Sequence, residues 1–233
     1  MTKKHILSLA LVGVMTSSGL FAIPQVTMGI FDSGSSGNYR ADPNAELAYL
    51  LNNYALGKST DGTYFGTFCI EGNEYFSPGE TYNVALNNRA LNGGLYTPTL
   101  GYDVISQGTA YLYSQFAVGT LSGFTYNNAG AGLSLQHMIW WLEGEIGSGL
   151  APSDISANPF AGLLNTQFGD LTTAKLDYSG TEVGVMNLTD ANQGRHQDQL
   201  VYLGSSRVPE SGWTIAFLGA SLMGLGWHRR KLK

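Results

Sequence analysis

Apolar residues recur along the central part of the chain with two different periods. Alternating or short apolar runs that favour β-strands occupy residues 26–31, 63–71, 80–86, 182–188 and 199–203. Apolar residues at helical spacing occupy residues 45–54, 106–118, 133–145 and 159–168. We therefore expect strands at both ends of this region and helices grouped between the early and the late strands.

Local signals refine the first half of this pattern. Asp42-Pro43 precedes the helical segment 45–54 as a capping residue and a first-turn proline, and Gly57 follows it as a stop. The strands at 63–71 and 80–86 flank a turn-rich segment, so we expect them to be neighbours in a sheet. The order of elements predicts one α+β domain over residues 23–207. Its antiparallel sheet or partial barrel has the helices inserted between strands, and the terminal strands share one sheet.

Composition excludes several classes of protein. Of the 233 residues, 43% are hydrophobic and 12% are aromatic, so the chain is not a charged disordered tail. A single cysteine, Cys69, excludes an intramolecular disulfide and a cysteine-rich zinc site, and we expect no metal and no cofactor. Cys69 is therefore either a buried side chain or a reactive group.

The charge distribution argues against nucleic acid as a partner. The formal net charge of the whole chain is −5. Six of its twelve basic residues lie close to the two termini, so the central region is more acidic than the whole. An acidic surface repels a phosphate backbone, and we expect no binding to nucleic acid.

Residues 1–22 have the three parts of a secretory signal peptide. Lys3 and Lys4 precede an apolar stretch at residues 6–15, and small and polar residues follow. Two cleavage sites stay open: Ala22 has Leu20 rather than a small residue two positions earlier, and Ser18, with Thr16 at that place, suits the small-residue rule equally well. The pattern predicts that the protein is exported.

Residues 208–233 form a second signal at the other end of the chain. A short motif is followed by the apolar run 213–227 and the basic segment 228–233, and the motif consists of Val208, Pro209, Glu210, Ser211 and Gly212. The apolar run is shorter than the roughly 20 residues of a comfortable membrane-spanning helix. The basic segment is expected to stay on the cytoplasmic side of the inner membrane, which leaves everything before it outside.

This tripartite C-terminus resembles the PEP-CTERM class of bacterial sorting signals, and most closely its VPDSG-like variant. Glu210 stands where that variant usually has Asp. The resemblance implies transient anchoring in the inner membrane through the short helix, recognition by an exosortase and removal of the tail. It further implies that the mature protein reaches the cell surface or the extracellular matrix.

One glutamine in the predicted helix 133–145 requires a partner. Gln136 lies beside a face formed by Leu135, Met138, Ile139 and Leu142, and a buried carboxamide is uncommon unless it is hydrogen-bonded. Cys69, in a mostly apolar strand, is a candidate partner. Attack of its thiolate on the Gln136 carboxamide, with loss of ammonia, would leave an internal thioester that joins a strand to a helix.

These segments resemble the Cys-Gln thioester domains of bacterial surface adhesins. The two hallmarks of that family are an aromatic-Cys strand, here Phe68-Cys69-Ile70-Glu71, and a Gln segment, here Leu135-Gln136-His137-Met138-Ile139-Trp140. The likeness extends loosely to residues 197–201. It implies a thioester between Cys69 and Gln136 that a nucleophile on a target, typically an amine, opens to form a covalent link to Gln136.

A thioester must be protected from water until its target arrives. Four aromatic residues are expected to wall it off: Phe68, Tyr111, Trp140 and Trp141. His137 directly follows Gln136 and points about 100° away on a helix, which argues against a role in proton transfer.

The sequence thus predicts an exported surface or matrix protein, not an enzyme, that attaches covalently to an amine- or hydroxyl-bearing protein or polysaccharide. The chain has no repeat stalk, which favours links to neighbouring matrix components over adhesion to a host. The alternative is a structural or binding module of the extracellular matrix in which Cys69 is inert. A hydrolase is the third interpretation.

Overall fold

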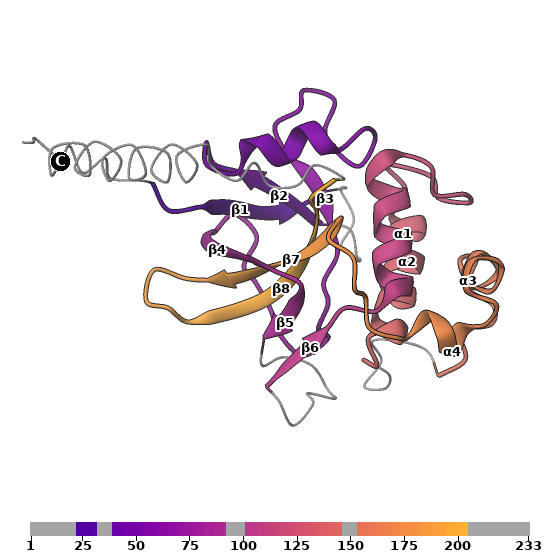
Figure 1. Ribbon diagram of the computed structural model, residues 1–233. Helices are drawn as coiled ribbons and strands as arrows, with labels where there is room; N and C mark the ends of the chain where they lie inside the picture. Colours follow the sequence, from indigo (N-terminus) through magenta and orange to yellow (C-terminus); the bar gives the residue numbers. More distant parts are fainter. Residues whose placement is uncertain (1–21, 32–38, 92–100, 146–152, 205–233) are drawn as a thin grey trace, which may run out of the picture.

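The computed structural model describes residues 22–31, 39–91, 101–145 and 153–204. Its main element is a six-stranded antiparallel sheet with the strand order β3-β2-β1-β4-β7-β8 (Figure 1). These strands are β1 (Gln25–Ile30), β2 (Tyr39–Pro43), β3 (Phe65–Thr67), β4 (Thr81–Asn87), β7 (Val183–Thr189) and β8 (Arg195–Tyr202). A second, two-stranded sheet pairs β5 (Arg89–Leu91) with β6 (Tyr102–Val104).

The two edge strands of the large sheet, β3 and β8, are linked by the chain that follows β3. Cys69 and Gln199 face each other in an isolated antiparallel bridge. On either side of it, the Leu200 amide donates to the Phe68 carbonyl at 3.1 Å and the Ile70 amide donates to the Asp198 carbonyl at 3.2 Å. The sheet is not a closed barrel, but this short seam joins its edges and pairs backbone groups that an open edge would expose.

The helices lie beside the sheet as a group. They are the 3₁₀ helix η1 (Ala48–Asn53) and the α-helices α1 (Gln107–Val118), α2 (Ala129–Leu142), α3 (Ala161–Phe168) and α4 (Leu171–Ala174). Figure 1 shows α1 and α2 side by side next to the sheet, with α3 and α4 farther out. Ser106 caps α1 by accepting from the Thr109 amide at 3.1 Å, and Asn128 caps α2 by accepting from the Ala131 amide at 3.0 Å.

A buried carboxyl ties the end of α2 to the start of α1. Glu143 accepts hydrogen bonds from the Ser106 amide at 3.1 Å, from the Ser106 hydroxyl at 2.8 Å and from the Thr109 hydroxyl. Burial is the main cause that raises the pKa of Glu143 to about 7, and these hydrogen bonds act in the opposite direction. The contact fixes how the two helices are placed relative to each other.

The core fills the space between the sheet and α1. Leu112, Tyr113 and Phe116 of α1 are fully buried and belong to one apolar cluster with residues of β7 and β8. The Tyr113 hydroxyl donates to the Gly66 carbonyl at 2.9 Å, which links α1 to β3. Burial of these side chains removes apolar area from water and supplies most of the stabilisation of such a layer.

The predicted α+β class is confirmed, and the first and last strands do share one sheet. Two local predictions were wrong. Asp42 and Pro43 belong to β2, where Pro43 pairs with Val26, and the helix that follows is a 3₁₀ helix that begins only at Ala48. The strands β3 and β4 are not neighbours, because β2 and β1 form an antiparallel pair that lies between them.

Apart from Ala22, the two predicted terminal signals, including the motif Val208–Gly212, lie outside the described residues. Within the part of the chain that is described, no helix combines the length and apolar character needed to cross a membrane.

Candidate functional site around Cys69 and Gln136

The structure brings Cys69 and Gln136 into direct contact across 67 positions of sequence. The backbone amide of Cys69 donates to Oε1 of Gln136 at 2.9 Å. In return, Nε2 of Gln136 donates to the carbonyl oxygen of Cys69 at 2.7 Å. The carboxamide therefore pairs with both backbone groups of the cysteine, as a neighbouring strand would.

Both residues are placed by their secondary structure. Gln136 lies on the buried face of α2 beside Leu135 and Ile139, as the helical spacing predicted, and none of its side chain is exposed. Cys69 lies in the seam between β3 and β8 and is 1% exposed. A second contact holds the same two segments together, because Oε2 of Glu145 accepts from the Gly72 amide at 3.0 Å.

The thiol of Cys69 is held in its protonated form. Burial is the main cause that raises its pKa far above the ordinary value, since a thiolate is poorly solvated in an apolar interior. The nearby carboxyl of Glu71 raises the pKa further. Side-chain hydrogen bonds from Gln199 and Tyr39 lower it and oppose the effect of burial.

Aromatic rings close the site on the side of α1. Phe68 is fully buried, and its ring lies 6.2 Å from that of Tyr113 and 5.1 Å from that of Phe116, in edge-to-face arrangements. These rings exclude water from the segment that carries Cys69. Of the four aromatic residues expected to shield the site, Phe68 is the one that packs in this cluster of rings.

The other three predicted wall residues make different contacts. The Tyr111 ring packs at 5.8 Å against Phe168 of α3, and the Trp141 ring lies 3.8 Å from the ammonium group of Lys175. Trp140 is partly buried, and its Nε1 is a buried donor without a hydrogen-bond partner among the described residues. Tyr111 and Trp141 thus face the outer helices. Trp141 does so because positions 136 and 141 of α2 differ by about 140° around the helix axis.

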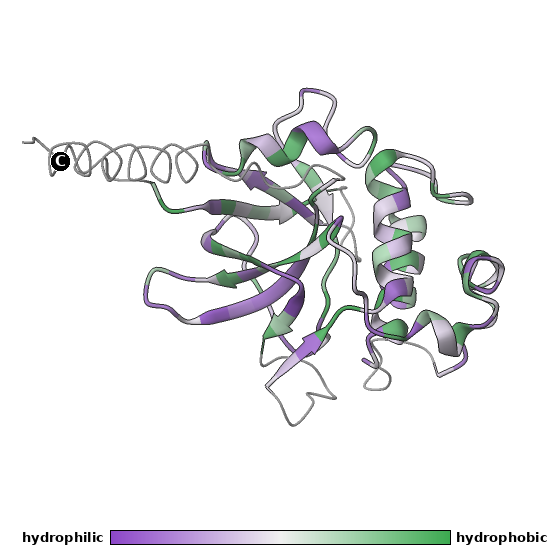
Figure 2. Cartoon of the chain, in the orientation of Figure 1, coloured by the Kyte–Doolittle hydropathy of each residue, from purple (hydrophilic) through white to green (hydrophobic). Residues whose placement is uncertain are grey.

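A buried polar strand, β8, contacts the sulfur. Figure 2 shows β8 as a mostly hydrophilic strand, yet Gln197, Asp198 and Gln199 are all buried. Nε2 of Gln199 lies 3.3 Å from Sγ of Cys69, and Nε2 of Gln197 donates to the Glu71 carbonyl at 2.6 Å. Polar side chains are rarely buried without a reason, so this strand is part of the site.

Two carboxyls are buried at the same strand. Oε2 of Glu71 accepts from the Asp198 amide at 3.2 Å, while Oδ2 of Asp198 accepts from the Leu91 amide at 2.7 Å and from Asn187 at 2.8 Å. Burial is the main cause that raises the pKa of both carboxyls. Among the described residues, no group of three or more acidic, histidine or cysteine side chains is arranged to hold a metal ion.

Gln199 is the site residue that the sequence interpretation missed. Residues 197–201 were recognised as a segment, but no role was assigned to any of them. The available signal was the polar run at residues 195–199, whose last member, Gln199, begins the predicted strand 199–203. An exposed edge strand has the same pattern, so only the burial of this run could reveal its role.

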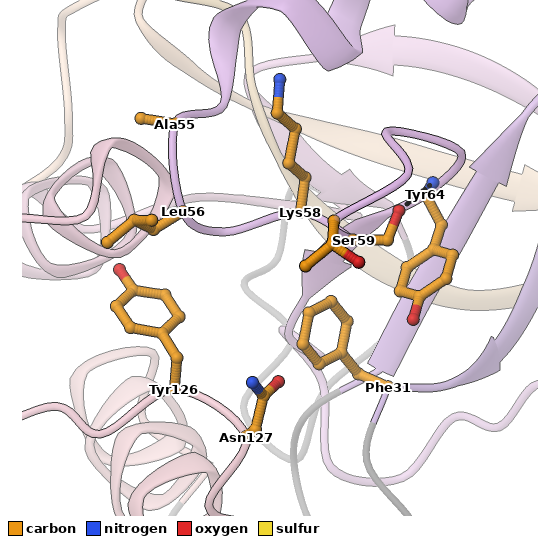
Figure 3. Close-up of a pocket in the computed structure, with 9 residues that line it drawn as sticks. Phe31, Ala55, Leu56, Lys58, Ser59, Tyr64, Tyr126 and Asn127 are labelled. Atoms are coloured by element: carbon orange, nitrogen blue, oxygen red, sulfur yellow. Dashed lines mark hydrogen bonds between the residues drawn. The ribbon is translucent and has the colours of Figure 1, made fainter.

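A separate surface groove lies near the first turn of α2. It has a volume of about 430 Å³, and Figure 3 shows Tyr126 on its helical side with Phe31 and Tyr64 on its strand side. Neither Cys69 nor Gln136 lines it. Tyr126 stacks on Phe116 at 5.4 Å, so a row of rings lies between this groove and Phe68.

No family model matches the chain, and no curated protein or solved structure matches it either.

Proposed function

We propose that this protein forms an internal thioester between Cys69 and Gln136 and uses it to attach covalently to a nucleophile on a target. The observation that carries the proposal is the reciprocal pair of hydrogen bonds between the Gln136 carboxamide and the backbone of Cys69. It holds an electrophilic carbon beside the only cysteine of the chain. Proximity of this kind is the main requirement for a reaction between two otherwise unreactive groups.

The bond forms in one balanced exchange. Sγ of Cys69 attacks Cδ of Gln136, the Cδ–Nε2 bond breaks, and the amide nitrogen leaves as ammonia with the proton of the thiol. The Cys69 amide already donates to Oε1, the oxygen on which negative charge develops during the attack. A donor fixed at this oxygen lowers the barrier in the manner of an oxyanion hole.

Opening the bond transfers the acyl group to the target. A primary amine attacks Cδ of Gln136, the Cδ–Sγ bond breaks, and the sulfur takes a proton that the amine releases. The product is a substituted amide on Gln136 and a free thiol on Cys69. Burial of the pair behind Phe68, Tyr113 and Phe116 supports the proposal, because a thioester exposed to water would hydrolyse before it met its target.

The location of the protein belongs to the same proposal and rests on its terminal segments. We infer export through the signal at residues 1–22 and sorting by an exosortase through Val208–Gly212, with delivery to the cell surface or extracellular matrix. The partners are then amine- or hydroxyl-bearing proteins or polysaccharides of that matrix. Mass spectrometry of surface material would test the sorting step, and a retained Lys233 would argue against removal of the tail.

The thioester is tested by the mass of the intact purified domain. We expect the wild type to weigh one ammonia less than its sequence, and the deficit to be absent from Cys69→Ala and Gln136→Ala. Methylamine should add to Gln136 and release the thiol of Cys69 for labelling. Cys69→Ser is a further control, because the ester it could form reacts more slowly with amines.

A second function, an inert module of the extracellular matrix, is favoured by one observation. The Gln136 carboxamide satisfies both of its polar ends through Cys69 without any covalent bond, and burial keeps the thiol protonated. This alternative predicts a wild-type mass equal to the sequence mass and a Cys69 thiol that is fully titratable after denaturation. Either measurement on fresh protein separates the two functions.

A further inference from the structure

A second glutamine, on β8, contacts the sulfur of Cys69. Gln199 is fully buried in β8, and its Nε2 lies 3.3 Å from Sγ of Cys69. The backbone fixes this contact, because residues 69 and 199 face each other in the antiparallel bridge of the seam. Gln136 therefore holds the backbone of the cysteine, and Gln199 holds its sulfur.

The other end of the Gln199 carboxamide argues against a purely structural role. Its Oε1 is buried and has no hydrogen-bond partner among the described residues. An unpaired buried acceptor is unfavourable, and a methionine or leucine would fill the same space without that cost. The neighbouring Gln197 donates at 2.6 Å to the carbonyl oxygen of Glu71, a hydrogen bond to the backbone that explains its burial, whereas Nε2 of Gln199 lies 3.5 Å from the backbone carbonyl oxygen of Gln197.

We propose that Gln199 is the positioning residue that directs the Cys69 sulfur and stabilises its negative charge, both when the thioester forms and when it opens. This inference rests on the proposed function. During formation the sulfur must give up its proton and attack Cδ of Gln136. During opening the Cδ–Sγ bond breaks and its electron pair stays on the sulfur, which then takes a proton released by the amine.

The electrostatics of the site give this donor a specific task. Burial and the carboxyl of Glu71 both oppose a charged sulfur, whereas the hydrogen bond from Gln199 favours it, with a smaller contribution from Tyr39. A hydrogen bond to a charged group is stronger than one between neutral groups, so the contact strengthens at the step where charge develops. In the resting state the same contact adds little to stability.

The test compares two substitutions of the same kind. Gln199→Met removes the donor at the sulfur and keeps the size of the side chain, and the matched control is Gln167→Met, at an exposed residue of α3 that does not belong to the site. We expect the wild type to show the ammonia deficit and to react with methylamine. The thioester of Gln199→Met should open roughly 10- to 100-fold more slowly, the effect of losing one hydrogen bond to a charged group. The control should stay within about twofold of the wild type.

A second variant separates a hydrogen-bonding role from packing. In Gln199→Glu the carboxyl can donate to the sulfur when protonated, but it repels a thiolate when ionised. Burial raises the pKa of the neighbouring carboxyls Glu71 and Asp198, and it should do the same for a carboxyl at position 199. With hydroxylamine as the nucleophile, the opening rate of this variant relative to the wild type should therefore fall as the pH rises from about 5 to about 10. A packing role would leave the ratio constant. This measurement decides the question even if Gln199→Met does not fold.

The outcomes distinguish this inference from the function on which it rests. A wild type without the mass deficit removes the thioester and the role of Gln199 together. A wild type with the deficit, combined with a folded Gln199→Met that opens at the wild-type rate or a constant ratio for Gln199→Glu, overturns the role of Gln199 alone. A folded Gln199→Met that never acquires the deficit supports the role, because formation requires the same charged sulfur.

Discussion

Gln136 is expected to stabilise the fold even when no thioester is present. Its carboxamide is the hydrogen-bond partner of both backbone groups of residue 69, and the site is fully buried. The informative change is Gln136→Leu made in a Cys69→Ala background. Alanine at position 69 keeps the backbone and prevents the covalent bond, so the comparison of single and double variants reports the two hydrogen bonds.

The expected loss in the free energy of unfolding follows from the two backbone groups of residue 69 that are left without hydrogen-bond partners. A buried amide and a buried carbonyl that lose their hydrogen bonds cost about 1–3 kcal/mol each. The leucine recovers part of this, because it buries more apolar area beside Leu135 and Ile139 than the carboxamide did. We expect a net loss of roughly 2–4 kcal/mol, which lowers the melting temperature by roughly 5–15 °C in a domain of this size.

Urea denaturation followed by circular dichroism measures this loss directly. The matched control is Gln167→Leu in the same background, because Gln167 is an exposed residue of α3 and its change should stay within about 0.5 kcal/mol. A loss below about 1 kcal/mol for Gln136→Leu, at an unchanged denaturant slope, would refute the reasoning that Gln136 satisfies the backbone of the seam.

Two further predictions concern the helices that support the site. Burial raises the pKa of Glu143 from 4.5 to about 7. The folded state therefore binds this proton more tightly than the unfolded state, and the associated stability is complete below about pH 4.5 and lost as the pH rises through about 7. Unfolding free energies measured across this range should decline more steeply in the wild type than in Glu143→Gln, and equal slopes would contradict the assignment. A Cβ on Gly108 would lie 2.9 Å from the carbonyl oxygen of Ala174, whereas one on Gly162 meets nothing within 4 Å. Gly108→Ala should thus cost about 1–3 kcal/mol and Gly162→Ala should gain about 0.5–1 kcal/mol, and urea titrations that show no difference would exclude tight packing at Gly108.

Local sequence patterns predicted the helices and strands better than they predicted which strands lie next to each other. The helical spacing around Gln136 correctly identified α2 and its buried face, because a helix is defined by contacts three and four residues apart. The order of strands depends on contacts between distant segments, and the prediction that residues 63–71 and 80–86 pair was wrong for that reason. The prediction that Asp42-Pro43 starts a helix was wrong for a similar reason. Pairing with β1 holds these two residues in a strand despite their local helix-start signal.

The sequence by itself determined the α+β class, the single cysteine and the candidacy of Cys69 and Gln136 as a pair. Periodicity, composition and short motifs are properties of neighbouring residues, so they can be read without coordinates. Only the tertiary structure decided that Cys69 lies where the two edges of the sheet meet, that Gln136 pairs with its backbone and that Gln199 lies on its sulfur. These contacts join residues 67 and 130 positions apart. Their geometry results from the packing of α2 against the seam between β3 and β8, and no local pattern contains that information.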